Sequence, residues 1–196
     1  MSLPRLLLTG FEPFSNFTEN ISMLIVDEIA TRGINGVEIK ALILTVDENG
    51  SMLPSEIIEG NENFSAILQL GFSSGSDVVK IEKIGRNEYD MRIPDNSGRR
   101  IENGPIIANG PAEISTNSPI SSIELAIGDS DFASWSMDAG GFVCNETYFR
   151  TLMAVSTSHE PKTPVLFVHL PDKEAVTLDL QLELVKKISK CLCGII

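Results

Sequence analysis

"PVLFVHL", residues 164–170, is a strongly apolar run that opens on a proline and carries a histidine next to its end. Its length and composition predict a buried strand. Beyond it, apolar residues recur at helical spacing and predict an amphipathic helix over residues 173 to about 191, with an apolar face of Val176, Leu180, Leu184 and Ile188. The chain therefore closes with a strand followed by a helix.

The same alternation of strands and helices recurs upstream. Further apolar segments predict strands at residues 5–9, from Val37, at 65–71 and from Val78. Helices are predicted over residues 21–32, over 52–60 with Pro54 early in the helix, from Ser122, and from near Gly141 to about Ser156, whereas residues 111–120 are expected to be irregular. The sequence thus predicts an α/β fold, a single-domain three-layer sandwich whose mostly parallel central sheet is covered by helices on both faces.

Composition is typical of an ordinary soluble globular domain. The 196 residues suffice for one substantial core and hardly for two, so residues 1–196 are predicted to form one domain. Hydrophobic residues make up 42% and charged residues 21% of the chain. No run of about 18 apolar residues is present, so no membrane span is expected, and no secretory signal is expected either.

Charge and cysteine content restrict the partners and the compartment. The net charge is −12, and the 15 lysines and arginines form no run, so a nucleic-acid binder is not expected. A protein that acts on small or neutral ligands fits better. The three cysteines, Cys144, Cys191 and Cys193, are too few for a disulfide framework and indicate a reducing compartment. Metal binding by Cys191 and Cys193 is not expected, because no further ligand cluster lies near them.

A site is expected at the carboxyl ends of the predicted parallel strands. This rule selects Gly10–Phe14, Gly71–Gly75 and His169. Phe11 and Phe14 follow the first strand, and they are either core residues or one wall of an apolar ligand pocket. Phe142 is a candidate for the opposite wall.

Cys144 lies in "DAGGFVCNETYF", residues 138–149, at the predicted start of a helix. A nucleophilic cysteine reacts as the thiolate, which the exposed amides and the dipole of a helix N-terminus stabilise. Gly140 and Gly141 would let the backbone approach a substrate closely. The alternative is a buried structural cysteine, and the segment alone leaves both interpretations open.

A cysteine nucleophile usually works with a histidine base, and the chain has two histidines. His159 lies in a polar connection and is expected to be solvated, whereas His169 ends an apolar strand as either a core or a site residue. Glu82, in the otherwise apolar "VVKIEKIG", could orient the histidine, or it could be a surface residue of an edge strand. Arg92, which shares "MRIPDN" with Asp95, is either an ion-pair residue or a donor to an oxyanion.

Together these segments resemble the motifs of the pyroglutamyl peptidase I family, also called pyrrolidone-carboxylate peptidases. "LLLTGFEPFSNFTENIS" is similar to the family's N-terminal motif, TGF-x-PF followed by Asn-x-Ser. The other matches are "IEKIGRN" and "RIPDNSG" with its glutamate and arginine segments, "GPAEISTNSPI" with its Gly-Pro-Ala and Ser-Thr stretch, "DAGGFVCN" with its nucleophile motif, and "FVHLP" with its histidine motif. The blocks occur in the family's order between residues 6 and 171.

The resemblance implies a cysteine peptidase that removes N-terminal pyroglutamate from peptides through a Cys-His-Glu triad and an acyl-enzyme. Cys144 would be the nucleophile, His169 the base, and Glu82 the group that orients the imidazole. Arg92 would help to stabilise the oxyanion. The residues that would bind the substrate are Phe11, Phe14, Phe142, Gly71, Phe72 and Asn20.

The implied pocket has particular roles for these residues. Phe14 and Phe142 would sandwich the lactam ring, with Phe11 in support. Asn20 would brace the loop near Gly71, whose neighbouring backbone would hydrogen-bond the lactam. The resemblance also implies no metal or cofactor, a cytoplasmic location and assembly into dimers or tetramers.

The chain departs from the family pattern after the third predicted strand. Members usually carry Gly-x-Ala-Gly-Gly-Arg there, whereas this chain has "GFSSGS" at residues 71–76, without the arginine and with Phe72 in place of a commonly polar residue. "NIS" at Asn20 also lacks the usual proline or small residue. Two alternatives follow: a divergent member that binds with weak or no peptidase activity, or a thiol hydrolase of another small amide.

Overall fold

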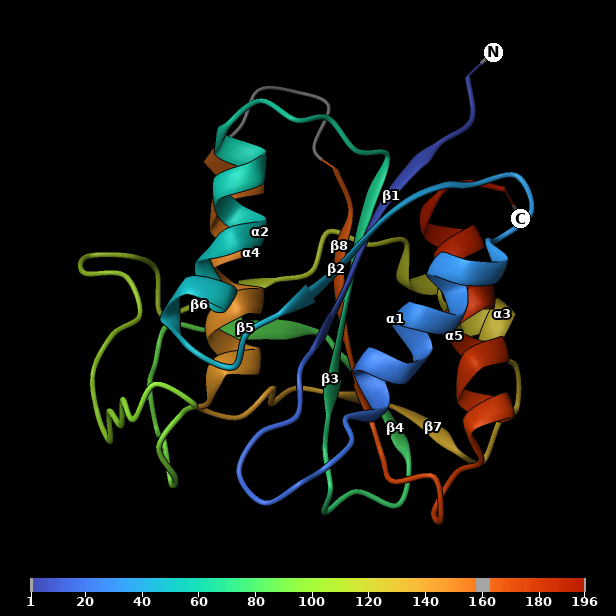
Figure 1. The fold of residues 1–196 in the computed structure, drawn as a ribbon. Helices are drawn as coiled ribbons and strands as arrows, with labels where there is room; N and C mark the ends of the chain where they lie inside the picture. The colour runs from blue at the N-terminus through green and yellow to red at the C-terminus, as the bar shows by residue number, and fades with distance from the viewer. Residues whose placement is uncertain (1, 158–162, 196) are drawn as a thin grey trace.

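The computed structural model describes residues 2–157 and 163–195, so the expectation for His159 lies outside the described residues. Figure 1 shows a central sheet with helices on both sides. The strands are β1 (Arg5–Phe11), β2 (Glu38–Leu44), β3 (Ala66–Phe72), β4 (Val79–Glu82), β5 (Ile84–Arg86), β6 (Glu113–Ser115), β7 (Ala133–Ser136) and β8 (Val165–Leu170). The helices are α1 (Ile21–Arg32), α2 (Glu48–Glu59), α3 (Ile120–Ile127), α4 (Val143–Thr157) and α5 (Leu178–Leu192).

Six strands form one sheet in the order β2-β1-β3-β8-β4-β7, and β5 pairs with β6 in a second, two-stranded sheet. The strands from β2 to β8 in that order are parallel, β4 is antiparallel to β8, and β7 is parallel to β4. The carboxyl ends of β1, β3 and β8 lie together at the bottom of Figure 1. The loops that follow these strands therefore meet at one edge of the sheet.

The apolar runs of the sequence form the centre of the sheet because both of its faces are covered. Leu6, Leu7 and Leu8 of β1 are fully buried. The strands pack on one face against α1, α3 and α5 and on the other against α2 and α4. Burying each leucine contributes about 1.5–3 kcal/mol, which exposure at a sheet edge would forfeit. The predicted three-layer α/β sandwich is confirmed.

Side-chain caps set where two helices begin. The Asn20 side chain accepts a hydrogen bond from the Ser22 N–H at 3.0 Å, and α1 spans the predicted residues 21–32. The predicted start of α2 at residue 52 is wrong, because Asp47 accepts from the Gly50 N–H at 2.9 Å and the helix begins at Glu48. Pro54 consequently lies inside the helix and not in its first turn.

Three further boundaries differ from the sequence predictions. The single strand predicted from Val78 is interrupted at Lys83, so that β4 joins the main sheet and β5 the small one. Residues 113–115, predicted to be irregular, form β6 by pairing with β5. The strand β7 was not predicted, and because it pairs outside β4, Glu82 does not lie on an edge strand.

The last helix begins at Leu178 and not at residue 173, because Thr177 caps it. Leu180, which the sequence placed on the apolar face, is 47% exposed. The other three residues predicted on that face, Val176, Leu184 and Ile188, are buried, and Val185 joins Leu184 and Ile188 on the buried side of α5. No helix in the parts of the chain described here has the length and apolar character needed to cross a membrane.

Candidate active site

Cys144 is the second residue of α4 and is half-buried. The first N–H groups of a helix have no acceptor within the helix, and they carry the positive end of its dipole. A negative charge on the sulfur would therefore be stabilised by the backbone that carries it. The predicted helix start lay two residues before the observed Val143.

His169 and Glu82 come from neighbouring antiparallel strands and are in direct contact. The Nδ1 atom of His169, at the end of β8, lies 2.8 Å from Oε1 of Glu82 on β4. Glu82 is fully buried, and the His169 side chain is 11% exposed. The other carboxylate oxygen of Glu82 has no hydrogen-bond partner among the described residues. A buried carboxylate needs a partner, and here the imidazole is that partner.

The protonation of His169 is set by its two neighbours. Burial opposes the charged form of the imidazole, but hydrogen bonds and charge interactions with Cys144 and Glu82 outweigh burial and raise the pKa of His169 to about 9. At neutral pH the ring is therefore an imidazolium that is bonded to Glu82 and interacts with the nearby Cys144. This arrangement allows the histidine to hold a proton and to donate it to a group bound beside the sulfur.

Gly71 lies where β3 passes the sulfur of Cys144. A Cβ atom at this position would stand 2.9 Å from Sγ of Cys144 and 2.8 Å from the ring of Phe167. Since real side chains do not approach so closely, the residue must be glycine for the sulfur to occupy its place. Gly71 also pairs with His169 in the sheet, which fixes the relative positions of the two strands.

A small pocket of about 110 Å³ opens beside Cys144 and His169. This is roughly the volume that three or four water molecules take up in the liquid, so it accommodates one small group. Apart from the sulfur and the imidazole, the pocket is almost entirely apolar; its other lining residues are Phe11, Phe14, Asn20, Val46, Phe72, Ala139, Phe142 and Val143.

Aromatic rings form the walls of this small pocket. The ring centroids of Phe14 and Phe142 lie 6.0 Å apart with an interplanar angle of 41°. Phe17 packs against Phe14 at 5.4 Å and against Phe72 at 5.1 Å. Phe17 was not among the residues selected from the sequence, although it lies in the same aromatic-rich loop, and it links the walls contributed by β1 and β3.

Asn20 supports a different loop from the one expected. Its Nδ2 donates to the carbonyl of Glu12 at 2.9 Å, and its Oδ1 accepts from the Ser22 hydroxyl at 2.7 Å. These bonds hold the segment between Phe11 and Phe14 against the start of α1. The expectation that Asn20 braces the loop near Gly71 is therefore wrong: its side-chain bonds go to the β1 loop.

The two glycines before Phe142 also have structural roles at the start of α4. A Cβ on Gly141 would stand 2.5 Å from the Asp90 nitrogen, so this glycine makes room for the Asp90 backbone. The Asp90 N–H donates to the Gly141 carbonyl at 2.9 Å. Gly140 has a φ of 78°, in the left-handed region that favours glycine, and it turns the chain into α4.

Arg92 lies outside the small pocket. Its exposed side chain lines a wider adjoining cleft of about 620 Å³, which His169 and Phe142 also line. Asp95, its neighbour in the sequence motif, is buried and accepts a hydrogen bond from Nε of Arg99 at 2.8 Å. The structure thus separates the two charges that the sequence placed together.

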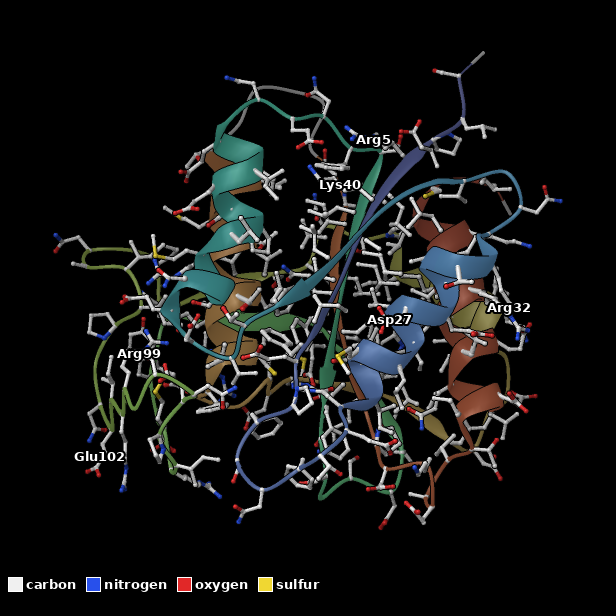
Figure 2. All side chains as sticks on the ribbon, viewed as in Figure 1. Arg5, Asp27, Arg32, Lys40, Arg99 and Glu102 are labelled. Carbon is white, nitrogen blue, oxygen red and sulfur yellow. The ribbon has the colours of Figure 1, made fainter. Side chains whose placement is uncertain are left out.

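A buried ionic cluster fastens the loop that carries Asp95 to the start of α4. Nη1 and Nη2 of Arg99 donate to the two carboxylate oxygens of Glu146 at 3.2 and 2.6 Å, and the Tyr89 hydroxyl donates to Glu146 at 2.7 Å. Burial opposes ionisation of Glu146, but these hydrogen bonds outweigh it and lower the pKa of its carboxyl. Figure 2 labels Arg99 on the side of the molecule where α2 and α4 lie.

Asn145 and Tyr148 also hold the first turns of α4. Asn145 exchanges hydrogen bonds with the backbone of Arg86 at 2.9 Å in both directions. The Tyr148 hydroxyl donates to the backbone carbonyl of Glu82 at 2.9 Å. These residues were not selected from the sequence. The signal that could have found them is the run of polar and ionisable residues after Cys144, in a helix whose first turns are buried.

Among residues 2–157 and 163–195, no cluster of ligating side chains suited to a metal ion is present.

Comparison with known proteins places this geometry in context. The sequence profile of the pyroglutamyl peptidase family matches residues 4–184. A pyrrolidone-carboxylate peptidase of Clavibacter michiganensis is 31% identical over 182 residues, covering 90% of this chain and 84% of the relative. One from Aliivibrio fischeri is 33% identical over 174 residues, covering 86% and 79%. The crystal structure of the pyrrolidone carboxyl peptidase from Fervidobacterium islandicum superposes with a TM-score of 0.83 at 30% identity, covering 94% of this chain and 96% of that one.

Proposed function

Since the chain belongs to the pyroglutamyl peptidase family of cysteine-type peptidases, we propose that it removes N-terminal pyroglutamate through a triad of Cys144, His169 and Glu82. The proposal assigns this activity to residues 1–196 as one catalytic domain. It includes a cytoplasmic location and a dimeric or tetrameric assembly, both of which rest on the family resemblance alone.

One observation carries the proposal. His169 contacts the buried Glu82 at 2.8 Å on one side and borders the same small aromatic pocket as Cys144 on the other. A sulfur and an imidazole from separate segments thus border a pocket for one small group, and a carboxylate from a third segment holds the imidazole. Nucleophile, base and orienting group in this order are the parts that acyl transfer by a thiol needs.

The proposed reaction has two stages. The Cys144 thiolate attacks the carbonyl carbon that follows the lactam ring, and the carbon–nitrogen bond breaks as His169 gives its proton to the leaving amine. The imidazole, now neutral, then takes a proton from a water molecule that attacks the thioester, which releases pyroglutamate and restores the thiol site. Glu82 holds the imidazole in position throughout and stabilises its charged form.

Two sources of positive charge are available for the developing oxyanion. Cys144 lies in the first turn of α4, whose N–H groups have no acceptor within the helix. Arg92, on the wall of the adjoining cleft, is proposed to add its positive charge there. An uncharged, flat lactam suits the aromatic walls. A ring stacked between Phe14 and Phe142 needs about 7 Å between their planes, so the observed centroid separation of 6.0 Å must widen on binding.

The test is a comparison of amides that differ only in the acyl group. We expect the protein to release the chromogenic amine from a pyroglutamyl amide with a kcat/KM at least about 100-fold above that for the prolyl amide, because the prolyl ring lacks the lactam oxygen and carries a charged amine into an apolar pocket. Equal turnover of both, or turnover of other acyl amides alone, would favour a different thiol hydrolase. Binding without turnover of any amide would favour a binding protein.

A further inference from the structure

The cleft of about 620 Å³ beside the small pocket contains most of the charges near the reaction centre. His169 lines both spaces, so a peptide with its first ring in the small pocket must pass the imidazole and continue into the cleft. The cleft is therefore where the residue that follows pyroglutamate lies. Its ionisable lining residues, His169 aside, are Lys80, Glu82, Arg86, Glu88, Asp90, Arg92 and Asp138.

Most of these charges already have partners. Nη1 of Arg86 lies 3.6 Å from Oε1 of Glu88 and 3.3 Å from Oδ1 of Asp138. Glu82 is hydrogen-bonded to His169. Arg92, which also forms no ion pair within the described residues, is proposed above to serve the oxyanion, and Asp90 is exposed. The lysine of the cleft, Lys80, forms no ion pair or side-chain hydrogen bond within residues 2–157 and 163–195.

Lys80 belongs to the minority of described cations that form no ion pair. The net charge of the chain is −12, and most of its described lysines and arginines lie within 4 Å of a carboxylate. Lys80 is half-buried on β4, next to the reaction centre, and has no carboxylate within 4 Å among the described residues. Its ammonium group is thus available to a negative charge that arrives with a ligand.

The sheet places Lys80 directly beside the proton donor. Lys80 on β4 is the register partner of His169 on β8. Directly opposed residues of antiparallel strands project from the same face, with Cβ atoms about 4.5–5.5 Å apart. Glu82, two residues further along β4, lies on that face as well and holds the imidazole. Lys80 and Glu82 therefore flank His169, and Lys80 borders the space where the leaving group must be.

We propose that Lys80 binds a carboxylate on the residue that follows pyroglutamate, so that the enzyme prefers pyroglutamyl dipeptides or substrates with an acidic leaving residue. The inference rests on the proposed function, because that reaction places the leaving nitrogen within hydrogen-bond reach of His169. In a dipeptide the α-carboxylate lies only two bonds beyond this nitrogen. A charge-assisted hydrogen bond from the ammonium then holds the leaving residue in place.

The experiment uses peptides that differ in one carboxylate. Pyroglutamyl-alanine is compared with its C-terminal amide, and pyroglutamyl-glutamate amide carries the charge on the side chain instead. We expect kcat/KM to be about tenfold higher for at least one of the carboxylate peptides than for pyroglutamyl-alanine amide, since hydrogen bonds to charged groups are worth about that factor or more. Which of the two is preferred identifies the source of the carboxylate. Equal values for all three peptides would overturn the inference and leave the proposed function intact.

Variants of Lys80 test whether this residue causes the preference for carboxylate peptides. Lys80→Met should remove it, and Lys80→Arg should restore most of it. The matched control is Lys83→Met, which removes the same charge three residues away, where the Lys83 ammonium stacks 4.9 Å from the Trp135 ring centre and does not line the cleft. Lys83→Met should keep the wild-type preference. A preference that survives in Lys80→Met, or is lost equally in Lys83→Met, would contradict the assignment.

Binding measurements keep this test separate from the test of activity. In a Cys144→Ala background, calorimetry with the same three peptides should show tighter binding of a carboxylate peptide, and the added Lys80→Met change should abolish the difference. That result would support the role of Lys80 even if the wild type turned over no peptide. Equal binding of all three, or no binding of any, would overturn it.

Discussion

We expect Cys144→Ala to lower kcat/KM for a pyroglutamyl amide by on the order of 10⁴-fold or more, because losing the nucleophile of a triad removes most of the rate enhancement. The remaining pocket and the first turn of α4 would still bind the substrate, so KM should change far less than kcat. The measurement is steady-state hydrolysis, with circular dichroism to verify that the variant is folded.

Cys193→Ala is the matched control for this prediction. Cys193 is a second half-buried free cysteine, but it follows α5, outside the small pocket and the cleft. Burial raises the pKa of its thiol to about 11, so it is the neutral, unreactive form at neutral pH. Its removal should leave turnover unchanged. A Cys144→Ala variant that keeps more than a tenth of the wild-type kcat/KM would show that the sulfur is not the nucleophile.

The second large effect concerns stability. We expect Arg99→Met to lower the free energy of unfolding by about 3–5 kcal/mol, because it takes away the ion-pair partner of the buried Asp95 and one of the two arginines that pair with the buried Glu146, which keeps only Arg150, at 3.0 Å. Glu146 is fully buried and accepts hydrogen bonds from both terminal nitrogens of Arg99. Asp95 accepts a hydrogen bond from Nε of Arg99. Urea denaturation at neutral pH would measure the change. Lowering the pH should reduce the difference in the free energy of unfolding between the variant and the wild type. The pKa of Glu146 is lowered in the folded protein, so its contribution to stability is lost as that carboxyl is protonated.

Arg100→Met is the matched control, one residue further along the same loop. The Arg100 side chain is 49% exposed, and its partner Glu102 is 65% exposed. Surface pairs of this kind are worth about 0–1 kcal/mol, so this variant should unfold close to the wild type. A similar loss of unfolding free energy in both variants would mean that any change in this loop destabilises the protein, and that the buried cluster is not the cause.

The Arg99 cluster matters for function because it connects the two walls of the small pocket. Glu146 lies in the first turn of α4, next to Cys144 and Phe142. On the other side, Asn96 donates hydrogen bonds to Oε1 of Glu12 at 2.9 Å and to the carbonyl of Pro13 at 3.1 Å. The loop between Asp95 and Arg99 thus holds the segment before Phe14 and the helix after Phe142 in one arrangement.

The strands that could be predicted from sequence are those whose apolar residues face two covered layers. The runs in β1, β3 and β8 have no other low-energy location, and the buried residues of β3 extend through Phe72. The edge strand β7 has only four residues, Ala-Ser-Trp-Ser, none of which is buried. Its strand character comes from pairing with β4, which is a tertiary contact that leaves no local pattern.

The catalytic candidates could be selected by chemistry, whereas their supports could not. Cys144 lies at a helix start and His169 at a strand end, which are positions that local sequence reveals. Arg99 and Glu146 are 47 residues apart, and neither carries a local signal that it is buried with the other. Lys80 carries no local signal of a role in the site, because its position opposite His169 depends on the antiparallel register of β4 with β8.

The central claim is that His169 is a charged imidazolium held between Cys144 and Glu82, and its titration tests this most directly. The chain has only two histidines, so ring nitrogen signals from ¹⁵N-labelled protein can be assigned by comparison with His169→Ala. We expect one imidazole, absent from that variant, to titrate near pH 9, because its charged neighbours outweigh burial. Since the unfolded value is about 6.5, this interaction stabilises the fold fully below that pH and is lost as the pH rises toward 9. In Cys144→Ala the midpoint should fall. A His169 signal that titrates at or below pH 6.5 in the wild type would contradict the account.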